Sequence, residues 1–396
     1  MTRAPVSRPV VAIVQKTLAH YRVPFFEHLR RRLDERDITL RLTYGRPSNE
    51  RARRNDTRTL PWAYEVENWT LRAGRHELYW QPCRHLLRDA DLVVVEQASK
   101  LLLNYVLLAW QAAGGPRLAF WGHGRNLQAH SASRVGEALK AYTSRRVHWW
   151  FAYNALSQRI VEGLGFPPDR ITNVQNAIDT RRLRTAYQST SDEEVQRLRA
   201  SLGLTGANVG LFVGGMYPEK RLGFLLEACR HVRATVPDFE MLWVGAGPDA
   251  SRVRDACAAT EWMHYVGPKF DTDRVPYFKL ASVFLMPGLV GLAILDAFSM
   301  ETPLVTTDLP YHSPEIDYLI PDENGVLVPE AASPRAYAGA VVALLQDDER
   351  RHRLIEAGRT ASTRYTVDDM ARRFAEGLQQ ALPPHAPAHP SPSALS

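Results

Sequence analysis

The segment 286–305 has the residue types of an anion-binding turn. Gly288 and Gly291 follow a short apolar run, and apolar residues then recur at helical spacing over 292–300. Glycines let a ligand approach the backbone, and the free N–H groups at a helix start favour an anion such as phosphate. Asp296 lies about one turn into this predicted helix, where a carboxylate can accept hydrogen bonds from a diol such as ribose. A buried strand, turn and helix without a ligand would show the same pattern.

A second glycine turn carries a cation. Gly214 and Gly215 follow the apolar run 209–213, and Lys220 precedes a helical pattern over 222–236. A lysine at this place is a compact charge that can neutralise a diphosphate. A surface lysine after an ordinary turn fits the pattern equally well.

A third turn, with Gly245 and Gly247, ends the predicted strand 241–244, and Pro248 suits the first position of a helix. Taken alone, this turn is more typical of structure than of binding. The tryptophan-rich run 149–151 is likewise expected to be a core strand rather than a platform for a sugar ring.

The elements that must position these turns alternate between strand and helix along nearly the whole chain, which favours an α/β fold with parallel sheets. The predicted strands are 10–14, 39–43, 92–95, 118–121, 149–152, 171–174, 209–213, 241–244, 263–266, 283–286 and 304–306. The predicted helices include 24–36, 101–112, 222–236, 334–346, 349–365 and 367–382, with a polar bridge over 187–192 and a helix capped by Ser191 that runs to 202. Two such sheets place the site in the cleft between two domains, because ligands bind beyond the carboxyl ends of parallel strands.

The composition is that of a folded protein with two domains. Hydrophobic residues make up 45% of the 396 residues and charged residues 23%. No apolar run approaches the roughly 18 residues of a membrane span. The three cysteines have no metal-ligand spacing and fit a reducing cytoplasm. The tail 383–396 is too poor in large apolar groups to fold, so we expect it to be disordered.

Charge is divided unevenly between the two halves. Residues 1–185 carry 30 Lys and Arg against 16 Asp and Glu, a net charge of +14, and the remainder carries −8. A basic first half can lie against an anionic membrane surface or an anionic substrate, or its charges can simply be solvated. Nucleic acid is not expected as a partner, because no recognisable binding motif is present.

In this order the motifs resemble glycosyltransferase family four, the retaining GT-B glycosyltransferases also called glycosyl transferases group one. The matching segments are 214–220, 244–248, 281–284, 288–297, 314–316 and 324–325, and 175–179 resembles the family's segment at the interdomain bridge. The resemblance implies a GT-B fold, with two Rossmann-like doubly wound domains that face each other across a cleft. The domains would be 1–180 for the acceptor and 181–365 for the nucleotide sugar, with a helix over 366–382 placed where it can pack back on the first domain.

The resemblance also implies that a nucleoside-diphosphate sugar lies against the second domain. Lys220 would bind the diphosphate, and Asp296 would take the ribose hydroxyls. The backbone of Val290, Gly291 and Leu292 would hold the distal phosphate. The turn glycines would complete this donor site: Gly214, Gly215, Gly245, Gly247 and Gly288.

Three positions depart from the family pattern. Gly215 replaces the family's turn arginine, so one phosphate cation is missing, for which Arg221 or a first-domain arginine can compensate. Gly288 replaces the first glutamate of the paired-acid motif, which usually touches the transferred sugar. Glu301 stands where the family usually has glycine. Recognition of the nucleotide is therefore better supported than recognition of the sugar.

On the first domain, His123 closes the predicted strand 118–121 and resembles the family's histidine that faces the donor sugar. A neutral imidazole there can help to stabilise an oxocarbenium-like transition state. The alternative is a structural turn histidine. The acceptor-binding candidates are Lys16, His20 and Arg22 in the first strand-to-helix turn, Glu96 at the end of another strand, and Arg125 and Asn126 beside His123.

The resulting hypothesis is a retaining glycosyltransferase that moves a hexose or deoxyhexose to a hydroxyl acceptor, which can be a cell-surface glycan, a lipid-linked compound or a natural product. We expect no cofactor and no metal, because no Asp-x-Asp motif lies in a suitable turn and because Lys220 and backbone N–H groups can neutralise the phosphate charge.

The alternatives to this hypothesis are a nucleotide-sugar 2-epimerase and a non-catalytic carbohydrate-binding subunit. The expected location is cytoplasmic, with a peripheral position on the inner face of the membrane allowed. Base, sugar and acceptor stay open.

Overall fold

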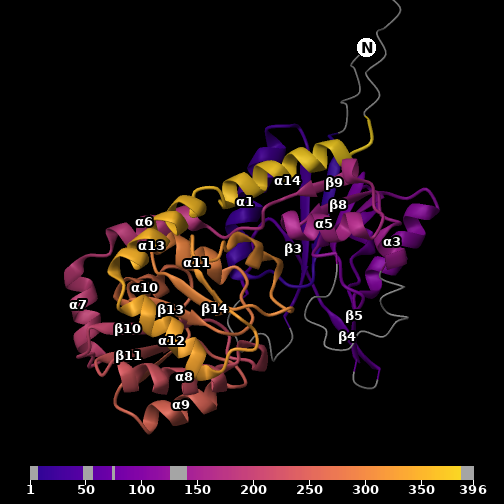
Figure 1. Cartoon of the computed structure of the whole chain (residues 1–396). Helices are drawn as coiled ribbons and strands as arrows, with labels where there is room; N and C mark the ends of the chain where they lie inside the picture. Colours follow the sequence, from indigo (N-terminus) through magenta and orange to yellow (C-terminus); the bar gives the residue numbers. More distant parts are fainter. Residues whose placement is uncertain (1–7, 48–56, 74–75, 125–140, 385–396) are drawn as a thin grey trace, which may run out of the picture.

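Two parallel sheets with helices packed around them make up the chain (Figure 1). The computed structural model describes residues 8–47, 57–73, 76–124 and 141–384. The predicted α/β class with two doubly wound sheets is confirmed. The tail from 385 onward lies outside the described residues.

The first sheet has seven strands in the order β3-β2-β1-β6-β7-β8-β9. Their bounds are β1 (Val10–Gln15), β2 (Thr39–Gly45), β3 (Tyr64–Val66), β6 (Leu92–Glu96), β7 (Arg117–Gly122), β8 (Trp149–Ala152) and β9 (Ile171–Asn173). All pairs in it are parallel. The strand order reverses between β1 and β6, which makes the carboxyl ends of these two strands a switch point where ligands bind in open sheets.

The second sheet has six parallel strands in the order β12-β11-β10-β13-β14-β15. They are β10 (Asn208–Val213), β11 (Phe239–Val244), β12 (Met263–Gly267), β13 (Val283–Met286), β14 (Leu304–Thr307) and β15 (Val326–Val328). Its switch point lies between β10 and β13. These two strands lead into the turns of Gly214 and Gly288, so the topology brings the two sequence motifs together.

The described helices are α1 (Val23–Asp34), α3 (Leu102–Ala112), α5 (Ala155–Gly163), α6 (Thr180–Ser189), α7 (Asp192–Ser201), α8 (Leu222–Thr235), α9 (Ala250–Ala258), α10 (Val275–Leu280), α11 (Ala293–Ser299), α12 (Pro334–Leu345), α13 (Asp348–Ser362) and α14 (Val367–Ala381). The helices that the sequence predicted have bounds close to the observed ones, whereas α5, α6 and α10 were not predicted. Ser191 caps α7 by accepting a hydrogen bond from the Glu194 amide, which confirms the capping prediction.

Some local predictions were wrong. The bridge over 187–192 is mostly the end of α6 and the start of α7, and α9 begins at Ala250 rather than at Pro248. The antiparallel hairpin of β4 (Trp69–Ala73) and β5 (His76–Trp80) was not foreseen, nor were β3 and β15. These strands are short, and edge or hairpin strands lack the continuous apolar runs of buried parallel strands.

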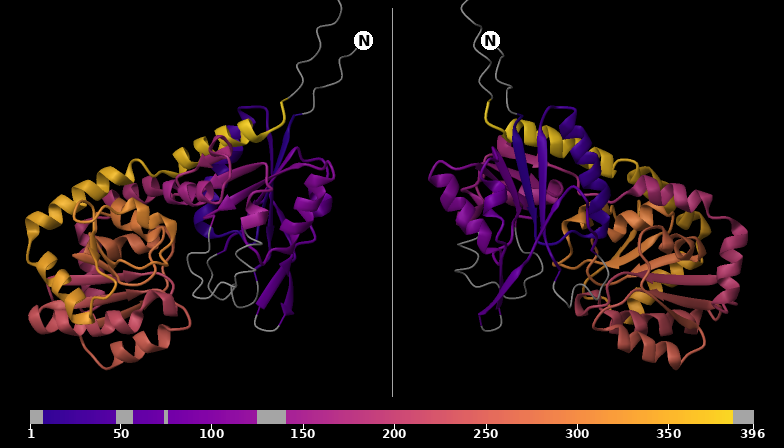
Figure 2. Two further views of the ribbon diagram at one scale, coloured as in Figure 1. Left: turned by 45° about the vertical axis from the view of Figure 1, so that its right-hand side comes forward. Right: turned by 180° about the vertical axis from the view of Figure 1, so that it is seen from behind.

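Helix α14 runs from the second sheet back to the first (Figures 1 and 2). Its buried Phe374 stacks on Phe151 of β8 with ring centroids 4.1 Å apart, and also packs against Phe25 of α1 and Trp121 of β7. Asp368, at the start of α14, pairs with Arg32 of α1 at 2.8 Å. We therefore describe the seven-stranded sheet, its helices and α14 as the first domain and the six-stranded sheet with its helices as the second.

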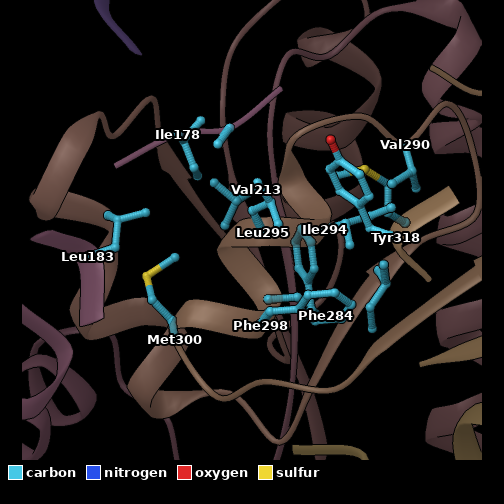
Figure 3. Close-up of a cluster of buried hydrophobic side chains, with 14 of the residues drawn as sticks. Ile178, Leu183, Val213, Phe284, Val290, Ile294, Leu295, Phe298, Met300 and Tyr318 are labelled. Carbon is cyan, nitrogen blue, oxygen red and sulfur yellow. The ribbon is translucent and has the colours of Figure 1, made fainter. Parts of the chain in front are cut away.

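A buried apolar cluster fixes helix α11 against the second sheet. Ile294, Leu295 and Phe298 of this helix point into the cluster beside Phe284 of β13 and Val213 of β10 (Figure 3). Because these side chains anchor the helix, the position of its first turn relative to the ends of β10 and β13 is set by packing.

Candidate functional site

The glycine turns after β10 and β11 fit into each other. A Cβ on Gly245 would lie 2.0 Å from the Gly214 carbonyl oxygen, and one on Gly247 would lie 2.2 Å from that of Met216. The turns also exchange hydrogen bonds, from the Gly214 amide to Val244 O and from the Met216 amide to Ala246 O. These glycines therefore have a structural reason to be glycine, and Gly215, at the tip of its turn, has the Tyr217 ring beside it.

Lys220 lies directly beneath the turn of Gly288. Its ammonium donates to Leu289 O and lies 3.4 Å from the Met286 sulfur, and the residue is 6% exposed. A Cβ on Gly288 would lie 2.3–2.4 Å from backbone atoms of Glu219 and Lys220. No side chain fits at 288 in this arrangement, which explains physically why the family's glutamate is absent.

The Lys220 ammonium is poorly solvated. Burial lowers the pKa of Lys220 to about 8, against a small opposing effect of Glu219. A buried cation beside a helix start is favourable for a phosphate, which would supply the missing counter-charge.

The Val290 amide already has a partner. It donates to Nδ1 of buried His312 at 3.0 Å, and His312 Nε2 donates to Thr307 O at 2.6 Å. These two bonds fix a neutral tautomer, and burial lowers the pKa of His312. At the start of α11, a phosphate would thus meet the amides of Gly291 and Leu292, while Val290 serves as a structural anchor.

Asp296 is paired with an arginine that the sequence did not single out. Arg274, in the turn η5 (Asp271–Arg274), donates to Asp296 Oδ1 at 2.6 Å. Burial raises the pKa of Asp296, and Arg274 opposes this rise. His20 of the first domain approaches the same turn, with Nε2 3.9 Å from Asp271 Oδ1 and its ring against Phe270. His20, Asp271 and Arg274 line one small pocket between the two domains.

On the first domain, Lys16 and Glu96 meet at the switch point of the sheet. Glu96 Oε1 accepts from the Lys16 amide at 3.0 Å, so this carboxylate holds the turn after β1. The Lys16 ammonium lies 3.4 Å from the centre of the Tyr79 ring, on β5 of the hairpin. This contact attaches the hairpin to the turn that was expected to bind the acceptor.

Arg22 is buried rather than displayed in the cleft. Its guanidinium donates to Asn176 Oδ1 at 2.6 Å and lies 4.7 Å from the Trp121 ring centre. His123 follows β7 with its ring 4.5 Å from that of Tyr153. Arg125 and Asn126 lie outside the described residues.

A larger hollow of about 610 Å³ lies elsewhere, against the outer side of α13, with Tyr318, His352 and Tyr365 in its wall. None of the site residues predicted from the sequence lines it, so we do not assign chemistry to it. Among the described residues, no group of three or more His, Cys, Asp and Glu side chains could hold a metal ion. None of the described helices combines the length and the hydrophobicity needed to cross a membrane.

Residues 207–347 match the model of the family described as glycosyl transferases group 1. The chain has the GT-B fold, and its second domain is similar to the group 1 glycosyltransferases. A phosphatidyl-myo-inositol mannosyltransferase of Mycobacterium leprae (strain TN) is 32% identical over 157 residues, which cover 38% of this chain and 41% of that protein. A D-inositol 3-phosphate glycosyltransferase of Corynebacterium glutamicum (strain R) is 26% identical over 231 residues, 53% of each chain. The matches thus span about half of these relatives or less.

The GT-B fold is shared with solved structures over almost the whole length. The Anabaena protein HepE in complex with UDP has a TM-score of 0.67 at 14% identity, over 94% of this chain and 100% of that one. A sucrose-phosphate synthase from Thermosynechococcus elongatus has a TM-score of 0.67 at 15% identity, over 94% and 99%. The similarity to both concerns the fold.

Within the second domain, the sequence predicted the turns but not the residues that support them. Arg274 lies at the end of the short helix η5 and His312 lies in a loop, and neither has a spacing signal in the sequence. Asn176 and Glu315 were noted only as parts of matching segments, and their contact joins residues 139 positions apart. Such contacts depend on how the two domains are placed, which local patterns do not specify.

Proposed function

We propose that the protein is a glycosyltransferase that moves a hexose or deoxyhexose from a nucleoside-diphosphate sugar to a hydroxyl acceptor. The observation that carries this proposal is the position of Lys220, whose buried ammonium donates to Leu289 O in the loop between β13 and α11, at the switch point of the second sheet. A cation and a helix start that converge on one point form a diphosphate site. Asp296, in the first turn of α11, supplies the carboxylate for a ribose.

In this proposal each group acts on a different part of the donor. Lys220 and the amides of Gly291 and Leu292 neutralise the leaving diphosphate, which lowers the barrier to breaking the bond to the sugar. Asp296 binds the ribose hydroxyls after sharing or giving up its contact with Arg274. His123, as a neutral imidazole, stabilises the positive charge that develops on the sugar.

The acceptor proton goes to an oxygen of the leaving phosphate, and the new bond forms on the face that the phosphate leaves. Retention of configuration is proposed from the family resemblance alone. Lys16 and Glu96, which meet at the switch point of the first sheet, are the groups proposed to bind the acceptor. His20 is proposed to line the passage between the two domains.

We also propose that transfer needs no metal, because Lys220 and the start of α11 supply the positive charge. Activity should then survive EDTA. A loss that Mg²⁺ or Mn²⁺ restores would contradict this part of the proposal.

A membrane-presented acceptor is proposed from the basic first domain, whose segment 1–185 carries a net charge of +14. One relative is named for phosphatidyl-myo-inositol, which is a lipid. Sedimentation with vesicles containing anionic lipid tests this idea: binding that disappears at high salt supports it, and absence of binding at low salt favours a soluble acceptor.

The direct test of the proposed function is ligand-induced stabilisation followed by turnover. UDP, GDP or dTDP should raise the melting temperature, because binding to the native state stabilises it. His123→Ala should keep this shift but lose about 10²-fold or more in sugar transfer. A wild type that binds sugar nucleotides and converts them without any acceptor would favour the 2-epimerase alternative, and binding without turnover would favour a carbohydrate-binding subunit.

A further inference from the structure

Aromatic contacts connect His123 to a buried arginine. The His123 ring centre lies 4.5 Å from that of Tyr153, and the Arg22 guanidinium carbon lies 5.6 Å from the centre of the Tyr153 ring. Arg22 also contacts the rings of Trp121 and Tyr21. The guanidinium is thereby held in one orientation by the end of β7, the end of β8 and the loop before α1.

Two hydrogen bonds continue from this arginine into the second domain. Arg22 donates to Asn176 Oδ1 at 2.6 Å, and Asn176 Nδ2 donates to Glu315 Oε1 in the turn η6 (Pro314–Tyr318). All three residues are buried, and Glu315 is 3% exposed. Burial raises the pKa of Glu315, and the contact with Asn176 and the charge of Arg22 oppose this rise. A buried cation and a buried carboxylate thus balance each other across one amide side chain.

Glu315 lies against the proposed phosphate turn. A Cβ on Gly291 would be 3.9 Å from Glu315 Oε2 and 3.3 Å from Ser313 Oγ. The Ser313 amide donates to Val290 O at 3.1 Å, which ties the segment before η6 to the same turn. At its other side η6 is tied to the first domain, because Asn154 donates to Pro314 O.

We propose that Arg22, Asn176 and Glu315 form a positioning relay that fixes His123 at a set distance from the Gly291 turn. The roles of His123 and Gly291 rest on the proposed function, whereas the relay itself is a mechanical link that can be tested separately. The chain of contacts runs through two oriented hydrogen bonds and packed rings, so displacement at η6 is transmitted to the loop of His123. In this chain Glu315 acts on the reaction only through the groups that it holds.

The variant that isolates the relay is Glu315→Gln. Glutamine keeps the volume and the acceptor oxygen for Asn176 but removes the charge that balances Arg22. The matched control is Asp317→Asn, in the same turn, which breaks the largely exposed ion pair of Asp317 with Arg159 of the first domain, 2.9 Å long. Both variants remove one carboxylate charge from η6, and only the first lies in the buried chain.

Hydrogen–deuterium exchange provides a readout that does not require a substrate. Glu315→Gln should accelerate exchange in segment 288–296 and also in 119–124, whereas Asp317→Asn should leave both at the wild-type rate. Unchanged exchange of 119–124 in Glu315→Gln overturns the relay. If this variant does not fold, the double variant Arg22→Gln with Glu315→Gln removes both buried charges together. Exchange in segments 288–296 and 119–124 of the double variant then tests the relay.

The second readout is release of UDP from UDP-glucose, or of GDP from GDP-mannose, by the wild type and both variants. The relay predicts that Glu315→Gln lowers kcat by about 10–100-fold with KM nearly unchanged, because misplacement affects the transition state more than binding. Equal kcat in Glu315→Gln and wild type overturns the relay. A wild type that neither binds nor cleaves these donors contradicts the proposed function instead. In that case the hydrogen–deuterium exchange experiment alone tests the relay.

Discussion

At the scale of single residues, the site depends on Lys220, whose ammonium is surrounded by protein atoms instead of water. Lys220 is buried with one carbonyl partner, and Gly288 permits this because its Cα fits against the Glu219–Lys220 backbone. The absence of a side chain at 288 and the depth of Lys220 are therefore two aspects of one packing arrangement. A nucleotide would restore to the ammonium the counter-charge that burial has removed.

The lowered pKa of Lys220 predicts a pH dependence of nucleotide binding. A diphosphate favours the charged ammonium, so affinity should be constant below about pH 8. It should fall as the pH rises through that value, by up to about tenfold per pH unit, because the free protein must then take up a proton to bind. Calorimetry at pH 8–9 in buffers of different ionisation enthalpy should detect this uptake. An affinity independent of pH between 7 and 9.5 would exclude Lys220 as the responsible group.

The backbone at Glu301 favours the glycine of the family pattern, and this predicts a gain in stability on substitution. Its φ is +54°, in the left-handed region that costs a non-glycine residue roughly 1–2 kcal/mol. Glu301→Gly should raise the free energy of unfolding by about 1 kcal/mol, after the entropy of glycine in the unfolded chain is subtracted. Urea unfolding measures this change, and Glu301→Ala is the control, because alanine keeps the strain. Equal stability of the two variants would contradict the explanation.

At the scale of elements, the second domain is held at its switch point by interlocked turns. The loops after β10 and β11 approach each other closely. A Cβ atom added to Gly245 or to Gly247 would lie only 2.0 or 2.2 Å from a carbonyl oxygen of the other loop. Both also have φ above +150°, which side chains rarely adopt. The glycine pattern that signalled a binding turn therefore also specifies how adjacent loops pack.

A pair of glycine-to-alanine variants tests this packing. Gly245→Ala should destabilise the protein by roughly 3 kcal/mol or more, because the new methyl group meets backbone and the φ is unfavourable. Gly339→Ala, at an exposed position of α12 with no atom near the new Cβ, should instead stabilise by about 0.5–1 kcal/mol. Thermal or urea unfolding of both variants gives the comparison. A Gly245→Ala protein as stable as wild type would show that the two loops can separate freely.

The sequence predicted most of the central elements but few of the contacts between them. Buried parallel strands such as β1, β8 and β13 are short apolar runs, so their bounds were predictable to within a residue or so. The hairpin of β4 and β5 alternates polar and apolar residues in an irregular way and was missed. The pairing of Arg274 with Asp296, and of Asn176 with Glu315, arises only when segments far apart in sequence come together. No local period reports such pairs.

At the scale of the whole molecule, two domains are joined by more than one connection. The chain crosses once at the segment before α6 and returns through α14 (Figure 2). Phe374 of α14 enters the aromatic core of the first domain. The buried contacts of Arg22, Asn176 and Glu315 form a third connection. The relative position of the two switch points therefore depends on helix packing as well as on the chain segment that crosses between the domains before α6.

Phe374→Ala should separate domain placement from nucleotide binding. Loss of the ring leaves a cavity among Phe25, Trp121 and Phe151 and should cost about 3–5 kcal/mol. Because the proposed donor site lies on the second domain, nucleoside-diphosphate affinity of the folded variant should stay close to wild type while sugar transfer falls. A parallel loss of nucleotide affinity would show that the donor site requires the first domain.

The central claim is that Lys220 and the first turn of α11 hold the diphosphate of a sugar nucleotide. The most direct measurement is the Kd of UDP and of GDP by calorimetry at pH 7 for the wild type, Lys220→Ala and the exposed-lysine control Lys100→Ala. We predict that one nucleotide binds the wild type and the control equally, and that Lys220→Ala weakens it by more than about tenfold, the loss of one charge-assisted contact. Equal affinity of the wild type and a folded Lys220→Ala protein would contradict the account.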